Sequence, residues 1–233
     1  MPLQRNELVG ASPLFSGLSD QERSRIGQAL IARRFERDAS IYLRGDEAFA
    51  FYGVAEGRVR FSAASIDGKE LVLDYAGPGQ WFGEIGLFDS GPRVVDALAA
   101  EPTSLFVLAR RELLALCRGQ PDLLLRFLEL FSRRIRVAED IIIDASFLNL
   151  SARLAKKLLT LATDAARTDT TARGPSIRIS QDELGRLTGV TRESAGKQLK
   201  IWERDGMVEV DYGRLLIVDA PGLRRLVAAA VGE

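Results

Sequence analysis

The chain of 233 residues contains no histidine and only one cysteine, Cys117. Serine–histidine and cysteine–histidine catalysis both need an imidazole base, so neither mechanism is available. One thiol without imidazoles also excludes the usual zinc, haem and cysteine-ligated iron–sulfur sites, because each takes several ligands of these types. A lone cysteine cannot form an internal disulfide, which is typical of a reducing compartment. The composition therefore excludes large classes of enzymes and metal sensors.

Long apolar runs and a net charge are also missing. No run approaches the roughly 20 apolar residues that span a bilayer, and the N-terminal residues lack a signal-peptide pattern, so we expect a cytoplasmic protein without membrane contact. The 32 basic residues balance 32 acidic ones. Residues 150–233 hold 14 basic and 11 acidic residues (net +3), which leaves 18 and 21 (net −3) for the rest. The sign of this asymmetry suits a DNA-binding module at the C-terminal end.

The stretch Ser180–Lys200 predicts two short helices joined by a tight turn. Ser180 can cap the first helix in a capping box with Glu183, Gly189 allows a left-handed helix exit, and Thr191 can cap the second helix. In a helix-turn-helix, the first turns of the second helix enter the DNA major groove. Arginine and lysine pair there with guanine, glutamate with cytosine, and serine with phosphate, which makes candidates of Arg192, Glu193, Ser194 and Lys197. The alternative is an ordinary surface helical hairpin.

The segments around this motif predict a winged-helix domain. We expect a helix at 149–165, a polar linker at 168–175 and a strand at 176–179. Two strands, 207–210 and 214–218, form a hairpin after the helix-turn-helix, with Arg214 placed to meet phosphate. A closing helix is expected at 221–231.

Residues 38–109 have a different pattern, with short apolar strands punctuated by glycines. Strands are expected at 49–54, 58–61, 70–75 and 104–108, with a hairpin turn at 66–69. A helix with Asp20 as its cap is expected within 12–34. The many short strands predict a small antiparallel jelly roll, which either encloses a ligand cavity or has a solid core.

A long helix is expected to start at Pro121. Its apolar residues are spaced alternately by four and three, which is a heptad seam and predicts a coiled coil with an identical partner. The alternative is that this face packs only against its own jelly roll. A dimer would present two recognition helices to a palindromic site. The seam residues are Leu124, Leu128, Phe131, Ile135, Ala138, Ile142 and Ala145.

The glycine-rich run from Gly77 to Phe88, followed by Gly91-Pro-Arg93, is a candidate ligand loop. Glycines let the backbone approach a ligand, and exposed amides can hold an anion. Glu84 can accept a hydroxyl hydrogen bond, and Arg93 can clamp a phosphate with two donors. The alternative is that these two side chains only pair with each other.

Taken together, the jelly roll, the Gly83-Glu84…Arg93 run, the long helix and the Thr191-Arg-Glu-Ser-Ala-Gly-Lys197 motif resemble the Crp/Fnr family of bacterial transcription regulators, from about residue 13 to 219. The resemblance implies an α+β chain with a β-roll effector domain of the cyclic-nucleotide-binding type (1–120), a dimerisation helix (121–147) and a winged-helix DNA-binding domain (148–233). It implies a homodimer that binds palindromic double-stranded DNA, with half-sites resembling TGTGA, and contacts RNA polymerase. The implied DNA-binding residues are Arg192, Glu193, Ser194, Lys197, Ser180, Thr191 and Arg214.

In cyclic-AMP-responsive members, the residues matching Gly83 and Glu84 contact ribose, and the one matching Arg93 grips the cyclic phosphate. The implied ligand set here is Gly83, Glu84, Ile85, Arg93, Val94, Arg134 and Phe61. This chain departs from those members. Val94 stands where they have serine or threonine, the loop before Arg93 is one residue shorter, Ala138 and Glu139 replace a threonine–serine pair that reads adenine, and Phe61 is bulkier than usual.

These departures predict a weak or absent response to cyclic AMP, with another nucleotide-like effector or ligand-independent binding as alternatives. No cofactor or metal is expected, and neither haem nor an iron–sulfur cluster. Two other functions compete. One is a nucleotide-sensing regulatory protein that acts mainly through protein contacts. The other is a hydrolase that uses Glu84, which we do not expect because no second carboxylate, nucleophile or metal set accompanies it.

Overall fold

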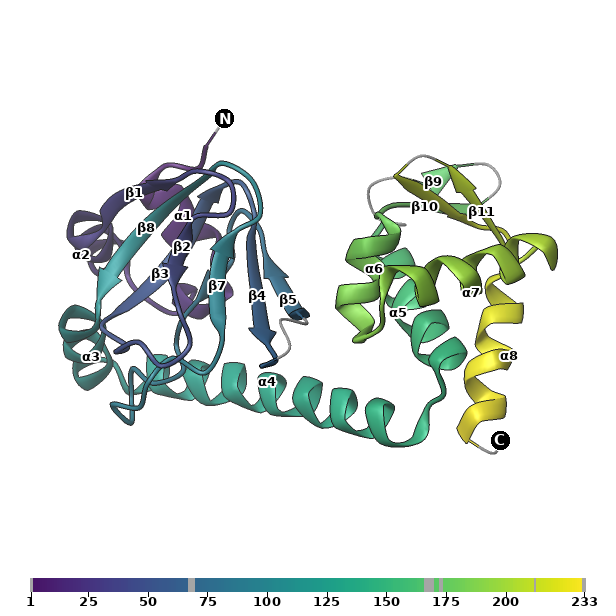
Figure 1. Cartoon of the computed structure of the whole chain (residues 1–233). Helices are drawn as coiled ribbons and strands as arrows, with labels where there is room; N and C mark the ends of the chain where they lie inside the picture. The colour runs from purple at the N-terminus through teal and green to yellow at the C-terminus, as the bar shows by residue number, and fades with distance from the viewer. Residues whose placement is uncertain (1, 67–69, 166–169, 172–173, 212, 232–233) are drawn as a thin grey trace. The chain divides into compact units, whose positions relative to one another are not determined.

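The protein is described by a computed structural model that covers residues 2–66, 70–165, 170–171, 174–211 and 213–231 (Figure 1). Residues 1–68 and 73–134 form one compact unit, and residues 69–72 and 135–233 form the other. The division into domains at residues 120 and 147 stays a prediction.

The first unit contains two four-stranded sheets that form a β-roll (Figure 1). One sheet has the order β1-β8-β3-β6 (Ile31–Phe35, Thr103–Ala109, Ala50–Glu56 and Trp81–Phe82). The other has the order β2-β7-β4-β5 (Ser40–Tyr42, Asp96–Ala99, Val59–Ala64 and Glu70–Ala76). Strands of both sheets contribute to one apolar cluster, which includes Tyr42, Tyr52, Phe61, Phe82 and Leu105. The jelly-roll prediction is confirmed.

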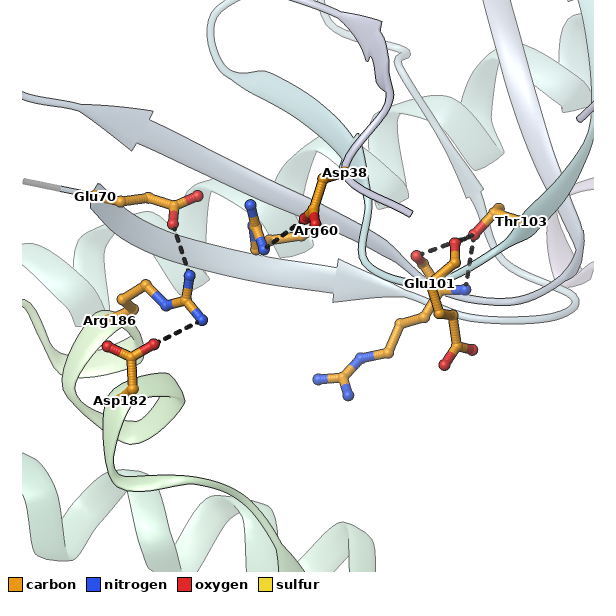
Figure 2. Close-up of polar contacts among 8 residues, drawn as sticks. Asp38, Arg60, Glu70, Glu101, Thr103, Asp182 and Arg186 are labelled. Atoms are coloured by element: carbon orange, nitrogen blue, oxygen red, sulfur yellow. Dashed lines mark hydrogen bonds and ion pairs between the residues drawn. The ribbon is translucent and has the colours of Figure 1, made fainter. Parts of the chain in front are cut away.

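Short helices cover the β-roll: α1 (Arg5–Ala11), the 3₁₀ turn η1 (Pro13–Phe15), α2 (Asp20–Ala29) and α3 (Arg110–Gly119). Together with the start of α4 (Pro121–Phe147), they enclose a second apolar cluster that includes Phe15, Ile26, Phe51, Leu113 and Phe127. Polar contacts also hold the loops next to strands β4 and β8. Figure 2 shows Arg60 of β4 paired with Asp38 at 3.9 Å and the hydroxyl of Thr103 bonded to the carbonyl of Glu101 at 2.7 Å.

The expected helix within 12–34 was wrong in both its extent and its cap. Ser19, not Asp20, is the N-cap, because its side chain accepts the backbone N–H of Glu22 and the carboxylate of Glu22 accepts the N–H of Ser19. The helix ends at Ala29, and Ile31 to Phe35 pair with Val107 to Thr103 of β8. A partner strand some seventy residues away determines this conformation, and local pattern cannot reveal it.

Helix α4 begins at Pro121 as expected and runs to Phe147. Leu123 and Phe127 face the β-roll and are buried. Of the heptad seam, Phe131 is half-buried and the other members are exposed, Leu128, Ile135 and Ile142 by 59–64%. The seam is therefore an apolar stripe that the β-roll does not cover.

The second unit is a winged helix. Its helices are α5 (Leu150–Ala165), α6 (Gln181–Thr188), α7 (Arg192–Arg204) and α8 (Ala220–Val231), and its sheet has the order β11-β12-β10-β9 (Val208–Asp211, Arg214–Ile217, Gly174–Arg178 and Thr170–Thr171). Leu154, Leu184, Leu199, Trp202 and Leu223 are among its buried core residues. The expected helices and wing hairpin are confirmed.

Two expectations in this part of the chain need comment. The linker expected at 168–175 was partly wrong, because Thr170–Thr171 and Gly174–Pro175 pair as strands. Antiparallel pairing with β12 aligns β10, and β9 extends the same sheet by one short strand. The hairpin turn expected at 66–69 lies largely outside the described residues.

Candidate DNA-binding surface and effector site

The turn between α6 and α7 is built from local signals in the sequence. The hydroxyl of Ser180 accepts the N–H of Glu183 at 3.1 Å, and that of Thr191 accepts the N–H of Ser194 at 3.1 Å, so both helices begin where expected. Gly189 ends α6 with φ of 69°, the left-handed conformation that favours glycine. The N–H of Val190 then donates to the carbonyl of Gly185 at 2.9 Å, which closes the turn.

Small residues let the two helices lie close together. A Cβ on Gly185 would come within 2.8 Å of the carbonyl oxygen of Val190, and one on Gly196 within 2.7 Å of Oε1 of Gln181. Ala195, Leu199 and Trp202 bury the inner face of α7. This packing leaves the opposite face of α7 in solvent.

The exposed face of α7 carries the predicted base-reading side chains. Arg192, Glu193 and Lys197 are exposed, and Ser194 is half-buried beside Thr191. Lys197 Nζ lies 2.6 Å from a carboxylate oxygen of Glu193, one helical turn away. The hydrogen bond and charge of Lys197 lower the pKa of Glu193, so this carboxylate is ionised at neutral pH. The helix therefore presents one acceptor and two cations together.

Several neighbours complete this surface. Lys200 is exposed one turn beyond Lys197 and was missing from the candidate set, although its i+3 spacing from Lys197 could have identified it. Arg214 is exposed at the start of β12, beside the wing turn, where the carbonyl of Gly213 accepts the N–H of Ile179. On α6, Arg186 pairs with Asp182 at 3.0 Å (Figure 2).

In the β-roll, Arg93 is buried, with 3% of its surface exposed. Its Nη1 donates to the carbonyl of Gly83 at 2.6 Å and its Nη2 to the carbonyl of Ala50 at 2.7 Å. Gly83 has φ of 86°, and a Cβ there would lie 3.0 Å from Nη1, so glycine permits this close approach. The Arg93 guanidinium also lies 4.2 Å from the centre of the Tyr42 ring.

Glu84 is also buried, and it pairs with the long helix rather than with Arg93. Nε of Arg134 lies 3.3 Å from Oε1 of Glu84, and Nη1 of Arg134 lies 3.3 Å from Asp74 of β5. Among the described residues, Glu84 and Arg93 therefore do not pair with each other, which was the alternative drawn from the sequence. Arg134 links the ligand loop, the second sheet and α4.

The remaining ligand candidates divide into two groups. Phe61 is buried with its ring 5.1 Å from that of Phe82, inside the same β-roll. Ile85 and Val94 flank Glu84 and Arg93 in the sequence, but their side chains are 39% and 49% exposed. The structure therefore brings Gly83, Glu84, Arg93, Arg134 and Phe61 into the β-roll interior or its margin and directs Ile85 and Val94 toward solvent.

Sequence reasoning missed the side chains that hold the ligand loop. Nε of Arg110 donates to the carbonyl of Leu87 at 2.6 Å, and its Nη2 donates to the hydroxyl of Ser90 at 2.8 Å. Phe88 packs against α4, where its ring centre lies 4.9 Å from that of Phe127 and 5.7 Å from that of Phe131. No local signal identifies these partners, because they lie about 20 to 40 residues from the loop.

In the described part of the chain, no three His, Cys, Asp or Glu side chains cluster so that they could hold a metal ion. Among the same residues, no helix is long and apolar enough to cross a membrane.

Comparisons with known proteins match two families to two separate parts of the chain. The cyclic nucleotide-binding domain family matches residues 32–120, and the Crp-like helix-turn-helix domain family matches residues 152–226. The chain is 33% identical over 215 residues to the cyclic AMP receptor protein of Thermus thermophilus, which covers 92% of this chain and 96% of that protein. It is 26% identical over 220 residues to the CRP-like cAMP-activated global transcriptional regulator of Mycobacterium tuberculosis, at 94% and 98% coverage.

A solved structure supports the fold. The c-di-GMP responsive global regulator CLP of Xanthomonas campestris matches with a TM-score of 0.76 and 27% identity, over 85% of this chain and 99% of that one. The arrangement of a β-roll, a long helix and a winged helix is therefore shared with this solved structure. The chain belongs to the Crp/Fnr family of transcription regulators.

Proposed function

We propose that this regulator binds a palindromic DNA site as a homodimer and reads each half-site with α7. The observation that carries the proposal is the exposed face of α7, where Arg192, Glu193 and Lys197 stand together while the opposite face is buried. Arginine and lysine donate to guanine in the major groove, and glutamate accepts from cytosine. Ser180, Ser194, Thr191 and Arg214 flank this face as phosphate contacts.

The binding test compares two arginines of the same helix. Arg192→Ala should lower the affinity for a palindrome of TGTGA-type half-sites by roughly 1–3 kcal/mol and leave the affinity for unrelated DNA unchanged. Arg204→Ala is the matched control, because Arg204 is exposed in the last turn of α7, three turns from Arg192. Fluorescence anisotropy at fixed salt measures both affinities. An equal loss on specific and unrelated DNA would show that Arg192 does not read bases.

The apolar seam of α4 supports the dimer. Four of its members, Leu124, Leu128, Ile135 and Ile142, are exposed by 40–64% and stand on one stripe. Large side chains on such a stripe are stabilised by a second copy of the same helix. A two-fold pair of winged helices would then meet two half-sites about one turn of DNA apart.

We propose in addition that cyclic AMP is a weak effector of this protein or none. Arg93 already donates to the carbonyls of Gly83 and Ala50, and Glu84 is paired with Arg134. Val94 offers no hydroxyl for a phosphate, and Ala138 cannot hydrogen-bond adenine through its side chain. Calorimetric titration with cyclic AMP should therefore show weak or no binding, and tight binding would refute this part of the proposal.

RNA polymerase is the second partner that we propose, and a basic groove beside β1 is a suitable surface. Arg33 and Arg34 on β1 line it together with Gln4 and Phe106, and Arg5 lines a second pocket that shares Gln4 and Phe106 with it. These cations would suit an acidic surface of the polymerase. Changing Arg33 and Arg34 together to Glu should abolish ternary complexes on promoter DNA without affecting DNA binding. Arg111→Glu, an exposed arginine of α3, is the control, and an equal effect of both changes would refute this assignment.

Catalysis is not part of the proposed function. Glu84 is the buried carboxylate of the ligand loop, and it is already paired with Arg134. Incubation with nucleoside triphosphates and cyclic nucleotides should give no turnover above that of buffer.

A further inference from the structure

Tyr42 covers the one buried arginine of the ligand loop. It ends β2, is 7% exposed, and its ring centre lies 4.2 Å from the guanidinium carbon of Arg93. The ring is held in place by two other aromatic residues, because its centre lies 5.7 Å from that of Tyr52 and 6.2 Å from that of Phe82. Arg93 therefore has an aromatic face packed over it.

Hydrogen bonds also hold Arg93 in place, through both terminal nitrogens of its guanidinium and through its backbone. Its two terminal nitrogens donate to the carbonyls of Gly83 and Ala50. Its backbone carbonyl accepts the N–H of Gly45 at 2.9 Å, and its backbone N–H donates to the carbonyl of Asp46 at 2.8 Å. Among the described residues, Nε of Arg93 is buried without a hydrogen-bond partner. The buried cation is thus only partly satisfied by hydrogen bonds, and the ring of Tyr42 supplies a further stabilising contact.

A phosphodiester anion would compete with these contacts. An arginine binds a phosphate most strongly when it donates two parallel N–H hydrogen bonds. Two of the five N–H donors of Arg93 go to the carbonyls of Gly83 and Ala50, and only 3% of the residue is exposed, so a phosphate that binds the guanidinium must turn it out of this buried position, away from the two carbonyls. That rotation also separates the guanidinium from the ring of Tyr42.

We propose that Tyr42 is a specificity-determining residue of the effector site, because its ring retains Arg93 on the carbonyls of Gly83 and Ala50 and so weakens the binding of cyclic nucleotides. The proposal rests on the weak cyclic AMP response proposed above and gives a cause for it. Tyr42 acts through Arg93 and is a positioning residue.

The phenol hydroxyl plays no part in this role. Burial raises the pKa of Tyr42 above its usual value, so the ring is neutral at any physiological pH. The attraction to Arg93 comes from the face of the ring, which phenylalanine also has. Tyr42→Phe should therefore behave like the natural chain, whereas Tyr42→Leu keeps apolar bulk and removes the ring.

The experiment is calorimetric titration of the full-length protein with cyclic AMP, into the millimolar range. Loss of a desolvated cation–π contact that opposes binding should tighten the dissociation constant of Tyr42→Leu by about threefold to thirtyfold. Tyr42→Phe should stay within about twofold of the natural chain. Tyr75→Leu is the matched control, because the ring of Tyr75 lies 3.6 Å from the guanidinium of Arg58, a second stack of the same kind.

Circular dichroism establishes that each variant is folded, and Tyr42→Met replaces Tyr42→Leu if the latter is not. Unchanged, weaker or undetectable binding by the folded ring-less variant would overturn the role of Tyr42 and leave the proposed weak response intact. An equal gain with Tyr75→Leu or Tyr42→Phe would overturn it too. Tight binding by the natural chain would instead overturn the proposed weak response, so the two failures are distinguishable.

Discussion

The heptad seam of α4, which we propose as the dimer contact, gives a prediction that two adjacent isoleucines can test. Ile142 belongs to the heptad seam and is 64% exposed, whereas Ile143 is 49% exposed and lies about 100° further around the helix. Both residues belong to α4, so their replacement by alanine changes the helix propensity by the same amount. Only Ile142→Ala should weaken the dimer.

The magnitude follows from the surface that dimerisation can still bury. Full burial of an isoleucine side chain is worth about 1.5–3 kcal/mol. With 64% of Ile142 exposed in the single chain, its remaining burial is worth roughly 1–2 kcal/mol per copy. Two copies meet in a symmetric dimer, so Ile142→Ala should cost about 2–4 kcal/mol and raise the dimer dissociation constant roughly 30- to 1,000-fold.

Sedimentation equilibrium over a range of protein concentrations measures this constant directly. Affinity for a palindromic site should fall in parallel, while affinity for a single half-site should not. Equal dissociation constants for Ile142→Ala and Ile143→Ala would refute the seam. So would a Ile142→Ala dimer as tight as that of the natural chain.

Three further predictions follow from single contacts. Thr191→Ala removes the cap of α7 and should lower the free energy of unfolding by about 1 kcal/mol in urea titration; no change would mean that the cap is dispensable. Gly83→Ala forces a Cβ onto a left-handed residue 3.0 Å from Arg93 and should cost about 1–2 kcal/mol, unlike Gly10→Ala, which has open space. Burial raises the pKa of Cys117 to about 11, so at pH 8 the thiol is protonated and should react with iodoacetamide only after urea unfolding; rapid labelling of the folded chain would contradict this.

The winged helix was predictable from the sequence because its signals are local. Ser180 and Thr191 each accept a hydrogen bond from a residue three positions later, and Gly189 adopts the left-handed exit itself. Caps and turns of this kind are encoded within one or two turns of helix. The boundaries of α6 and α7 therefore agree with expectation. The predicted extent of the N-terminal helix was wrong, because residues of its C-terminal part form strand β1, which is determined by pairing with β8.

The effector site was predictable only as a set of residue types. The sequence indicates a glutamate and an arginine as candidate ligands in this loop, and the structure shows that both are buried. Their partners could not be inferred, because Ala50 and Tyr42 lie 43 and 51 positions before Arg93, and Arg134 lies 50 positions after Glu84. The orientation of these side chains is determined by hydrogen bonds to strands and helices that are distant in the sequence. The spacing of residues along the chain does not encode this orientation.

Phe131 connects the ligand loop directly to the heptad seam of α4. Phe131 is a seam member, yet its ring also lies 5.7 Å from Phe88 of the ligand loop in an edge-to-face contact. Phe88 comes shortly after Glu84 in the same loop. Hydrogen bonds from Arg110 to the neighbouring residues Leu87 and Ser90 hold this part of the loop in place. Packed interiors do not deform continuously, so a ligand that displaces this loop must repack Phe88 against Phe131. The same ring would then change its contact with the second copy of α4, which gives an effector in the β-roll a route to the geometry of the dimer.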